Sequence, residues 1–425
     1  MKTTKIRRNK KLRKTKMTEK KYKGTIIGCF AGYVIQSIVN IFVPLLFLTF
    51  QNEYNIPLSE ITVLITVNFG VQLCVDLLSA LFVDKIGYRA SVYIAHVMSA
   101  CGLIFLTFLP GLTPDPFAGL LISVITYAIG GGLLEVLISP MVEACPSNNK
   151  PQVMSILHSF YCWGSAGVII ISTAFFALFG IEKWRIITVI WTLFPIANLI
   201  LFTQVPIATL EDGAEEKPSL KKLLKNKLFW MFMLVMLCAG ASENIISQWA
   251  SAFCESALGV NKSVGDLAGA ASFAVLMGIA RVLYGKFGKK IDLNMLMAIC
   301  GFGCVGAYLI ASLAQLPVLS LVGVGLSGLF CGIMWPATYS NASEAIKSGG
   351  TAMFALFALA GDLGCSSGPT AAGLFADAFG GSLKRGILFT AGFPAVLAVT
   401  MLIYALLRRK KAKELPLSEN NNISE

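Results

Sequence analysis

Long apolar runs separated by short polar loops make up most of the chain. A helix needs roughly 20 apolar residues to cross a bilayer core about 30 Å thick, and each run is long enough to do so. The runs lack the alternating pattern of a membrane barrel, and a helix satisfies its own backbone hydrogen bonds in lipid, so we predict helices. Twelve spans are expected, at residues 24–49, 60–83, 90–110, 117–143, 152–180, 184–204, 226–255, 264–287, 291–313, 317–342, 350–379 and 384–408.

The longest polar stretch between spans, residues 205–227, divides the helices into two sets of six. The segments 24–204 and 228–408 have equal length, and local features recur between them. Pro140 and Pro336 are 196 residues apart, and a glycine-rich turn after the second span recurs 201 residues later. Parallel six-helix repeats are a known plan of membrane transporters. We therefore predict an all-α membrane protein of two pseudo-symmetric six-helix halves.

Charge is distributed unevenly along the chain. Of 425 residues, 56% are apolar and only 14% are charged, whereas soluble domains average about 25% charged residues. The net charge is +12, but residues 1–23 alone carry +11, so the basic character belongs to a tail and does not indicate nucleic-acid binding. Such a tail can attract anionic lipids. Lys and Arg number 29 on the side of the N-terminus and 5 on the other, which predicts a multi-pass plasma-membrane protein with cytoplasmic termini, including a tail at 409–425.

Motifs of soluble enzymes and metal sites are absent from the sequence. The eleven Cys lie almost entirely in apolar runs without a C-x-x-C pair, which favours small buried side chains over metal ligands. No HExxH, GxSxG or P-loop motif occurs, and no loop is long enough to fold as a catalytic domain. We expect neither enzymatic activity nor a metal or cofactor.

Ionisable residues at membrane depth are costly and therefore mark functional sites. Glu135 is the strongest candidate, because the preceding glycines, 130–132, allow a helix or a solute to come close. A buried carboxyl group is easily protonated, so we predict that Glu135 couples transport to a proton gradient. Asp76 and Glu243 are further candidates for proton coupling. A structural hydrogen bond or substrate binding alone are the alternatives for Glu135.

Amide, hydroxyl and aromatic side chains recur at helical spacing on seven spans, whereas the third, sixth, ninth and twelfth spans are poor in them. The polar spans are expected to line a cavity, with the other four at the periphery. Amides, carboxylates and aromatic rings together suit sugar hydroxyls, although polar packing between helices is the alternative. Arg281 either extends to the interface or pairs with Asp362 or an anionic solute. The predicted substrate-binding residues are Gln36, Asn40, His158, Tyr161, Glu243, Asn244, Gln248, Trp249, Trp335, Tyr339 and Asp362.

The turn after the second span resembles a family signature. The run from Ala80 to Arg89, ALFVDKIGYR, is similar to the G-x-L-A-D-R-x-G-R/K-R/K motif of the major facilitator superfamily, with Ala80 in place of the first Gly. The resemblance implies the twelve-helix facilitator fold and a gate formed by Asp84, Gly87 and Arg89, with Glu143 as a further partner. A turn that only follows the positive-inside pattern is the alternative.

Three shorter motifs resemble the fucose–proton symporter group and its bacterial glucose/mannose relatives. They are Glu135-x-x-x-Ser139-Pro140, the run HSFY at 158–161, and Arg281 closely following Gly278. The resemblance assigns the proton-coupling acid of the fourth helix to Glu135. The sequence departs from the group at Ser139, where Asn is usual, and in having no acid in the first span. A second coupling acid would then be Asp76 or Glu243.

Together these features predict a secondary active transporter that uses alternating access for a small polar organic solute, preferentially a monosaccharide moved together with a proton. Proton-coupled efflux of amphipathic drugs or metabolites is the first alternative, because 28 Phe could build an apolar cavity. A membrane receptor that binds sugar without transporting it is the second. The dense amides favour a hydrophilic solute.

Overall fold

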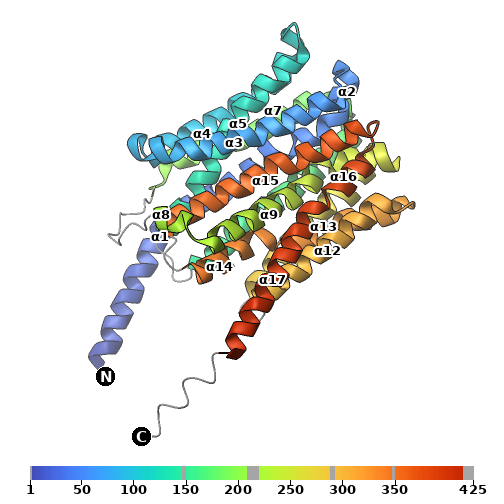
Figure 1. Ribbon diagram of the computed structural model, residues 1–425. Coiled ribbons are helices and arrows are strands. Elements are labelled where there is room, and N and C mark those ends of the chain that lie inside the picture. The colour runs from blue at the N-terminus through green and yellow to red at the C-terminus, as the bar shows by residue number, and fades with distance from the viewer. Residues whose placement is uncertain (1, 146–149, 208–219, 288–291, 347–349, 415–425) are drawn as a thin grey trace.

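The computed structural model describes residues 2–145, 150–207, 220–287, 292–346 and 350–414 (Figure 1). Every element in this part of the chain is helical, and a helix occupies each of the twelve predicted ranges. The first half contains α1 (Lys2–Ile41), η1 (Val43–Leu46), α2 (Phe47–Tyr54), α3 (Leu58–Ile86), α4 (Tyr88–Leu112), α5 (Pro116–Ala144), α6 (Lys150–Phe179), η2 (Ile181–Lys183) and α7 (Trp184–Gln204). The second half contains α8 (Leu220–Leu224), α9 (Lys227–Ala252), η3 (Phe253–Ala257), α10 (Lys262–Val264), η4 (Gly265–Ala271), α11 (Ser272–Phe287), α12 (Leu293–Leu313), α13 (Pro317–Cys331), α14 (Met334–Ala345), α15 (Gly350–Ala378), α16 (Leu383–Thr390) and α17 (Gly392–Glu414).

Among the described residues, eleven helical segments are long and apolar enough to cross a membrane. The one predicted span that is not among these eleven, 350–379, coincides with α15, a helix of 29 residues. Asp362, Ser366 and Pro369 lie in its middle and reduce its hydropathy, so its membrane-spanning character stays a prediction. At the two ends of the chain the helices extend beyond the predicted spans. The backbone of the basic tail 1–23 continues α1 from Lys2, and α17 continues to Glu414.

Long helices run side by side, with α4 at one flank of the bundle and α12 and α17 at the other (Figure 1). The two halves meet where α3 packs against α15 and where α6 packs against α11. The start of α1 and the end of α17 lie at the same end of the bundle (Figure 1). We call this the terminal end, and the opposite end, which holds the turns at 54–58 and 257–262, the distal end.

Glycines allow the closest approaches between helices. A Cβ atom on Gly364 of α15 would lie 2.0 Å from the carbonyl oxygen of Leu237 of α9, and one on Gly130 of α5 would lie 2.2 Å from Ser99 Oγ of α4. Side chains cannot be accommodated at such distances, so these glycines fix how near the helices lie. The glycine run before Glu135, predicted to permit close packing, has this role.

A proline breaks the first helix and frees a backbone acceptor. Pro44 lies in η1 and has no N–H, so the carbonyl oxygen of Asn40, four residues earlier, loses its helical donor. Gln248 Nε2 of the second half donates to this oxygen at 3.1 Å. A break that is local in sequence thereby becomes a hydrogen bond between the two halves.

His96 and most of the cysteines are buried among the helices. His96 of α4 is fully buried, with Nε2 2.9 Å from the amide of Asn198 on α7 and Nδ1 2.7 Å from the carbonyl oxygen of Val92. His96 thus forms an interhelical hydrogen bond between α4 and α7. All eleven Cys are free thiols, and nine of them are buried.

Candidate functional site

A polar cavity lies between the two halves. Together with the solvent space that opens onto it, its volume is about 550 Å³. Helices α1, α3, α5 and α6 of the first half and α9, α11, α14 and α15 of the second supply the described lining side chains. None of these comes from α4, α7, α12 or α17, the helices expected at the periphery. The lining residues are Tyr33, Gln36, Asn40, Phe69, Glu135, His158, Tyr161, Glu243, Asn244, Arg281, Trp335, Asp362 and Cys365.

Glu135 lines this cavity from α5, and a neutral amide is its hydrogen-bond donor. Gln36 Nε2 of α1 donates to Glu135 Oε2 at 2.6 Å. Gly131 and Gly132 place this part of α5 close to Val39 and Gln72, since a Cβ on either glycine would lie 3.0 Å from one of them. Among the described side chains, the ion pairs involve acids other than Glu135. Because an amide brings no charge, a proton is the simplest group that can neutralise Glu135.

Near Glu135, a tyrosine of α1 contacts side chains of both α5 and α6. The hydroxyl of Tyr33 on α1 lies 3.1 Å from Ser139 Oγ on α5 and 3.3 Å from His158 Nδ1 on α6. Ser139 occupies the position where the symporter group usually has Asn. It still supplies a polar atom, so a short network of neutral groups covers this wall of the cavity.

The other half contributes a buried ion pair. Arg281 Nη2 of α11 donates to both carboxylate oxygens of Glu243 on α9, at 3.0 and 3.2 Å, and the two side chains are each 10% exposed. Two of the predicted alternatives for Arg281, snorkelling to the interface and pairing with Asp362, are wrong, because the side chain turns inward to Glu243. Its pairing with an anionic solute stays a prediction. The described lining of the cavity includes one arginine, and it is already paired with one acid.

Local sequence explains why the guanidinium is held there. Pro336 has no N–H, so the carbonyl oxygen of Gly332 lacks its helical donor where α13 ends and α14 begins. Arg281 Nε donates to this oxygen at 3.0 Å, and Arg281 Nη1 donates to the carbonyl oxygen of His158 in the first half at 3.3 Å. These two hydrogen bonds fix the orientation of the guanidinium group, so that Nη2 points at Glu243.

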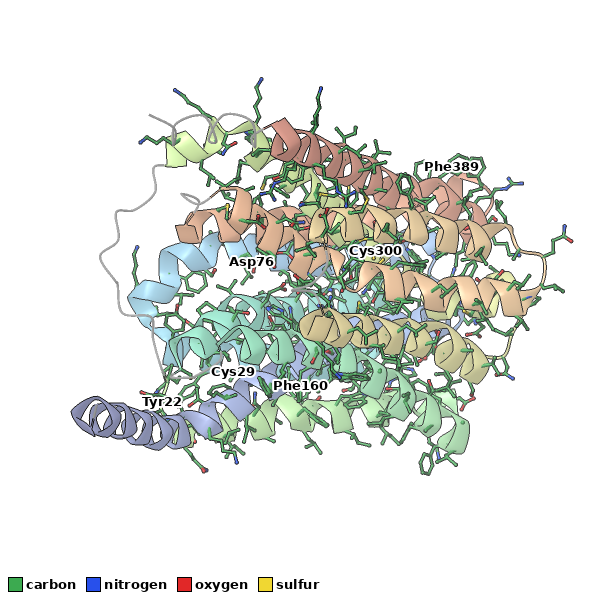
Figure 2. The ribbon with its side chains drawn as sticks, turned by 90° about the horizontal axis from the view of Figure 1, so that it is seen from below. Tyr22, Cys29, Asp76, Phe160, Cys300 and Phe389 are labelled. Atoms are coloured by element: carbon green, nitrogen blue, oxygen red, sulfur yellow. The ribbon has the colours of Figure 1, made fainter. Side chains whose placement is uncertain are left out.

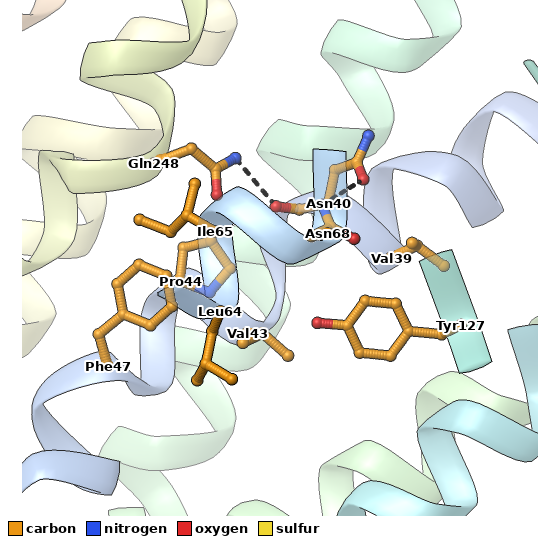
Figure 3. Close-up of a pocket in the computed structure, with 10 residues that line it drawn as sticks. All are labelled: Val39, Asn40, Val43, Pro44, Phe47, Leu64, Ile65, Asn68, Tyr127 and Gln248. Carbon is orange, nitrogen blue, oxygen red and sulfur yellow. Dashed lines mark hydrogen bonds between the residues drawn. The ribbon is translucent and has the colours of Figure 1, made fainter. Parts of the chain in front are cut away.

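A second, smaller pocket of about 200 Å³ lies toward the distal end (Figure 3). Asn40 connects it to the main cavity, because Asn40 lines both. Asn68 Nδ2 and Gln72 Nε2 both donate to Asn40 Oδ1, at 3.2 and 2.9 Å. Figure 3 shows Gln248 reaching the backbone of Asn40 from the other half. Asn40 therefore links α1 to the amides of α3 and α9, while Asn68 Oδ1 is buried without a described hydrogen-bond partner.

Polar contacts between the halves close the distal end. Lys262 of α10 donates to the carbonyl oxygen of Leu45 at 2.5 Å and lies 3.4 Å from Asp266. Asp266 is fully buried and accepts hydrogen bonds from Ser251 and, at 3.1 Å, from Thr173 of the first half. The hydroxyl groups of Thr66 and Thr370 lie 2.6 Å apart and join α3 to α15. These contacts join the two halves at the distal end.

At the terminal end, the described polar contacts run within one half. Gly87, in the predicted gate, has φ +83°, a value that favours glycine, and this glycine turns the chain from α3 into α4. Arg89 donates to the carbonyl oxygens of Phe202 and Val205 at the end of α7, at 2.9 and 3.0 Å. The side chains of Asp84 and Glu143 lie outside the described part of the chain.

Four of the residues proposed for proton coupling or substrate binding do not line the main cavity. Trp249 is fully buried, packs against Phe47 and donates from Nε1 to the carbonyl oxygen of Pro369. Gln248 belongs to the smaller pocket, Tyr339 packs against a phenylalanine of α15, and Asp76 of α3 is half-buried and is not among the described lining residues. The remaining residues of those two predicted sets line the main cavity.

The predicted substrate-binding set lacked Tyr33, Phe69 and Cys365, and Arg281 was expected at the site only in the alternative that pairs it with Asp362 or an anionic solute. A usable signal existed for Arg281, since an in-helix proline leaves a free carbonyl that a cation can bind, but the partner helix could not be identified from sequence. Phe69 and Cys365 resemble any other apolar residue of a membrane helix, and only the fold gives them their position.

Comparisons with known proteins agree with this architecture. The sequence model of the Major Facilitator Superfamily matches residues 25–369 and, in a second match, residues 257–422. The membrane protein MosC of Rhizobium meliloti is 24% identical over 365 residues, which cover 83% of this chain and 84% of MosC.

Solved structures show the same fold at low identity. A bacterial homolog of the human lysosomal transporter Spinster, inward-facing and unoccupied, superposes with a TM-score of 0.73 at 14% identity, covering 91% of this chain and 97% of the homolog. A D-xylose–proton symporter gives 0.71 at 13% identity, covering 90% and 97%. The E. coli fucose–proton symporter gives 0.63 at 14% identity, covering 90% and 99%.

Proposed function

Because the chain belongs to the major facilitator superfamily, as its sequence resemblance predicted, we propose that it moves a small polar organic solute by alternating access. The preferred solute is a monosaccharide, moved in symport with a proton. The N- and C-terminal segments are proposed to be cytoplasmic and the membrane to be the plasma membrane, on the basis of the Lys and Arg distribution. The distal end would then face outward, and the described conformation would be closed to the outside.

One observation carries the coupling proposal: Glu135 lines the cavity, and a neutral amide is its described hydrogen-bond donor. Such an acid is neutral when protonated and charged when the proton leaves, so its protonation changes the charge of the binding site. The one described arginine of the cavity is already paired with Glu243. Proton binding at Glu135 and solute binding beside it are therefore linked through the same small volume.

The lining of the cavity supports a hydroxylated solute. Gln36, Asn40 and Asn244 present amide groups, and Trp335 presents an aromatic face. Amides bind sugar hydroxyls as both donors and acceptors, and an aromatic ring packs against the apolar face of a sugar ring. These groups come from both halves, so a bound solute would contact both and could stabilise an occluded state.

The test uses purified protein reconstituted into vesicles. A thermal-shift screen with monosaccharides, polyols, organic anions and apolar cations first identifies a solute that stabilises the folded protein. We expect Glu135→Gln to abolish accumulation driven by a proton gradient, while counterflow of the same solute continues, since exchange needs no net proton transfer. Glu182→Gln, an exposed acid at the distal end, should leave both activities unchanged.

Three outcomes would contradict parts of the proposal. If Glu135→Gln still accumulates solute against its gradient, Glu135 is not the coupling acid. If apolar cations are the compounds that bind, drug efflux replaces sugar symport. If a sugar binds but wild-type vesicles never take it up, the protein is a receptor.

A further inference from the structure

A pair of carboxyl groups lies where the two halves pack together. Asp76, labelled in Figure 2, belongs to α3 and Asp362 to α15, and these two helices pack against each other between the halves. The two carboxyl groups are close enough to form a hydrogen bond with each other. Asp362 also lines the main cavity, so the pair connects the solute site with the contact between the halves.

The hydrogen bond requires a proton. Two carboxylates are acceptors only, and neither can donate to the other. In the part of the chain that the structure describes, the ion pairs of Lys and Arg involve other acids. One buried oxygen of each group, Asp76 Oδ1 and Asp362 Oδ2, has no described hydrogen-bond partner. Carboxyl groups in such contact share one proton, because two adjacent negative charges repel.

The surroundings add negative charge to the pair. Glu135 of α5 interacts electrostatically with both aspartates, and Glu243 of α9 acts on Glu135 in turn. Tyr339 of α14 and Cys365 of α15 are the other titratable groups that face Asp362. The described cation in the cavity, Arg281, is already paired with Glu243. An ionised pair would therefore sit within a group of acids.

We propose that Asp76 and Asp362 share one proton, and that this proton holds α3 against α15 between the two halves. Asp362 is 4% exposed and more deeply buried than Asp76, so Asp362 donates and Asp76 accepts. Release transfers one proton to water and leaves two carboxylates that repel each other, which favours separation of α3 from α15. The inference extends the proton coupling proposed above to a second site, but its test needs no solute.

The experiment follows protonated carboxyl groups by infrared difference spectroscopy, with the purified protein cycled between acidic and alkaline pH in vesicles. We expect Asp76→Asn and Asp362→Asn each to remove the same carbonyl band, because the introduced amide donates to the remaining aspartate and the shared proton is no longer needed. Glu135→Gln removes a different band. Asp377→Asn, an exposed aspartate on the same helix, removes none. In Asp76→Glu the band shifts but persists, which controls for folding.

Two results would overturn the proposal. If Asp76→Asn leaves the band of Asp362 unchanged, the proton is not shared. If sodium chloride added at constant pH removes the band from the wild-type protein, the pair binds a metal cation instead. Neither result bears on Glu135, whose role is tested by transport. If Glu135→Gln loses coupling but keeps the aspartate band, Glu135 and the aspartate pair are two separate proton sites, as proposed.

Discussion

The buried ion pair of Arg281 and Glu243 makes a sharp prediction about stability. Replacing Arg281 by Met removes both hydrogen bonds to Glu243 and leaves that carboxylate, 10% exposed, without its cation. At 3.0 Å and an effective dielectric constant of about 20, the attraction is about 5.5 kcal/mol, part of which offsets the cost of desolvation. Breaking one partner of such a pair costs about 3–5 kcal/mol of folding free energy. The free carbonyl of Gly332 adds to the loss.

The double variant Arg281→Met with Glu243→Gln separates charge from packing. Because it removes the stranded carboxylate, it should recover about 1–3 kcal/mol relative to Arg281→Met alone. Arg185→Met is the matched control, since Arg185 forms an exposed pair with Glu53 at 2.6 Å and should cost no more than about 1 kcal/mol.

Thermal unfolding can be followed with a thiol-reactive dye, because nine of the eleven cysteines are buried and become reactive on unfolding. From highest to lowest, the expected order of unfolding midpoints is wild type, Arg185→Met, the double variant and Arg281→Met. Equal midpoints for the two single arginine variants would refute the reasoning. So would a double variant less stable than Arg281→Met.

Three further predictions concern the packing and the two ends of the bundle. Gly364→Ala should strongly lower the unfolding midpoint, because its Cβ would lie 2.0 Å from a carbonyl oxygen, whereas Gly306→Ala, with nothing within 4 Å, should be nearly neutral. Lys262→Met should weaken the contact between the halves at the distal end and speed maleimide labelling of buried Cys254. An unchanged labelling rate would show that the hydrogen bond from Lys262 to Leu45 does not hold the halves together. Desolvation raises the pKa of Asp292, but hydrogen bonds from Arg409 and from the start of α12 outweigh it and leave the pKa below its usual value. Its stabilisation is therefore present above the unfolded pKa and lost as the pH falls through the folded pKa, so Asp292→Asn should weaken the acid dependence of the midpoint, by less than about 1 kcal/mol at this exposed site.

Much of the fold follows from the sequence because lipid leaves few options for an apolar chain. Each predicted span contains a helix, and the four spans poor in polar residues supply none of the described side chains that line the cavity. Polar content was informative because amides inside a membrane must find partners, and the neighbouring helices provide them. Gly87 was readable for a related reason, since a tight turn with positive φ favours glycine.

The sequence did not allow us to predict which side chains on different helices pair with each other. From the sequence, several acids were possible partners of Arg281, and helical spacing alone does not select Glu243 among them. Trp249 illustrates the converse error of emphasis, because an aromatic residue beside amides suggests a sugar site, whereas its ring packs against Phe47 and its indole N–H binds a backbone carbonyl. Both cases depend on how helices rotate about their axes when they pack, which the sequence of one helix does not determine.

The charges of the site support the proposed role of protons in transport. Glu135, Glu243, Asp76 and Asp362 bring four carboxyl groups to one region, and the described side chains there include a single guanidinium. Three uncompensated negative charges in a medium of low dielectric would repel strongly, so complete neutrality requires three further positive charges, supplied by bound protons or in part by a cationic solute. A neutral sugar cannot supply that charge. If the solute is a sugar, the protons must enter with it or before it, and their release as the halves separate would give the cycle its direction.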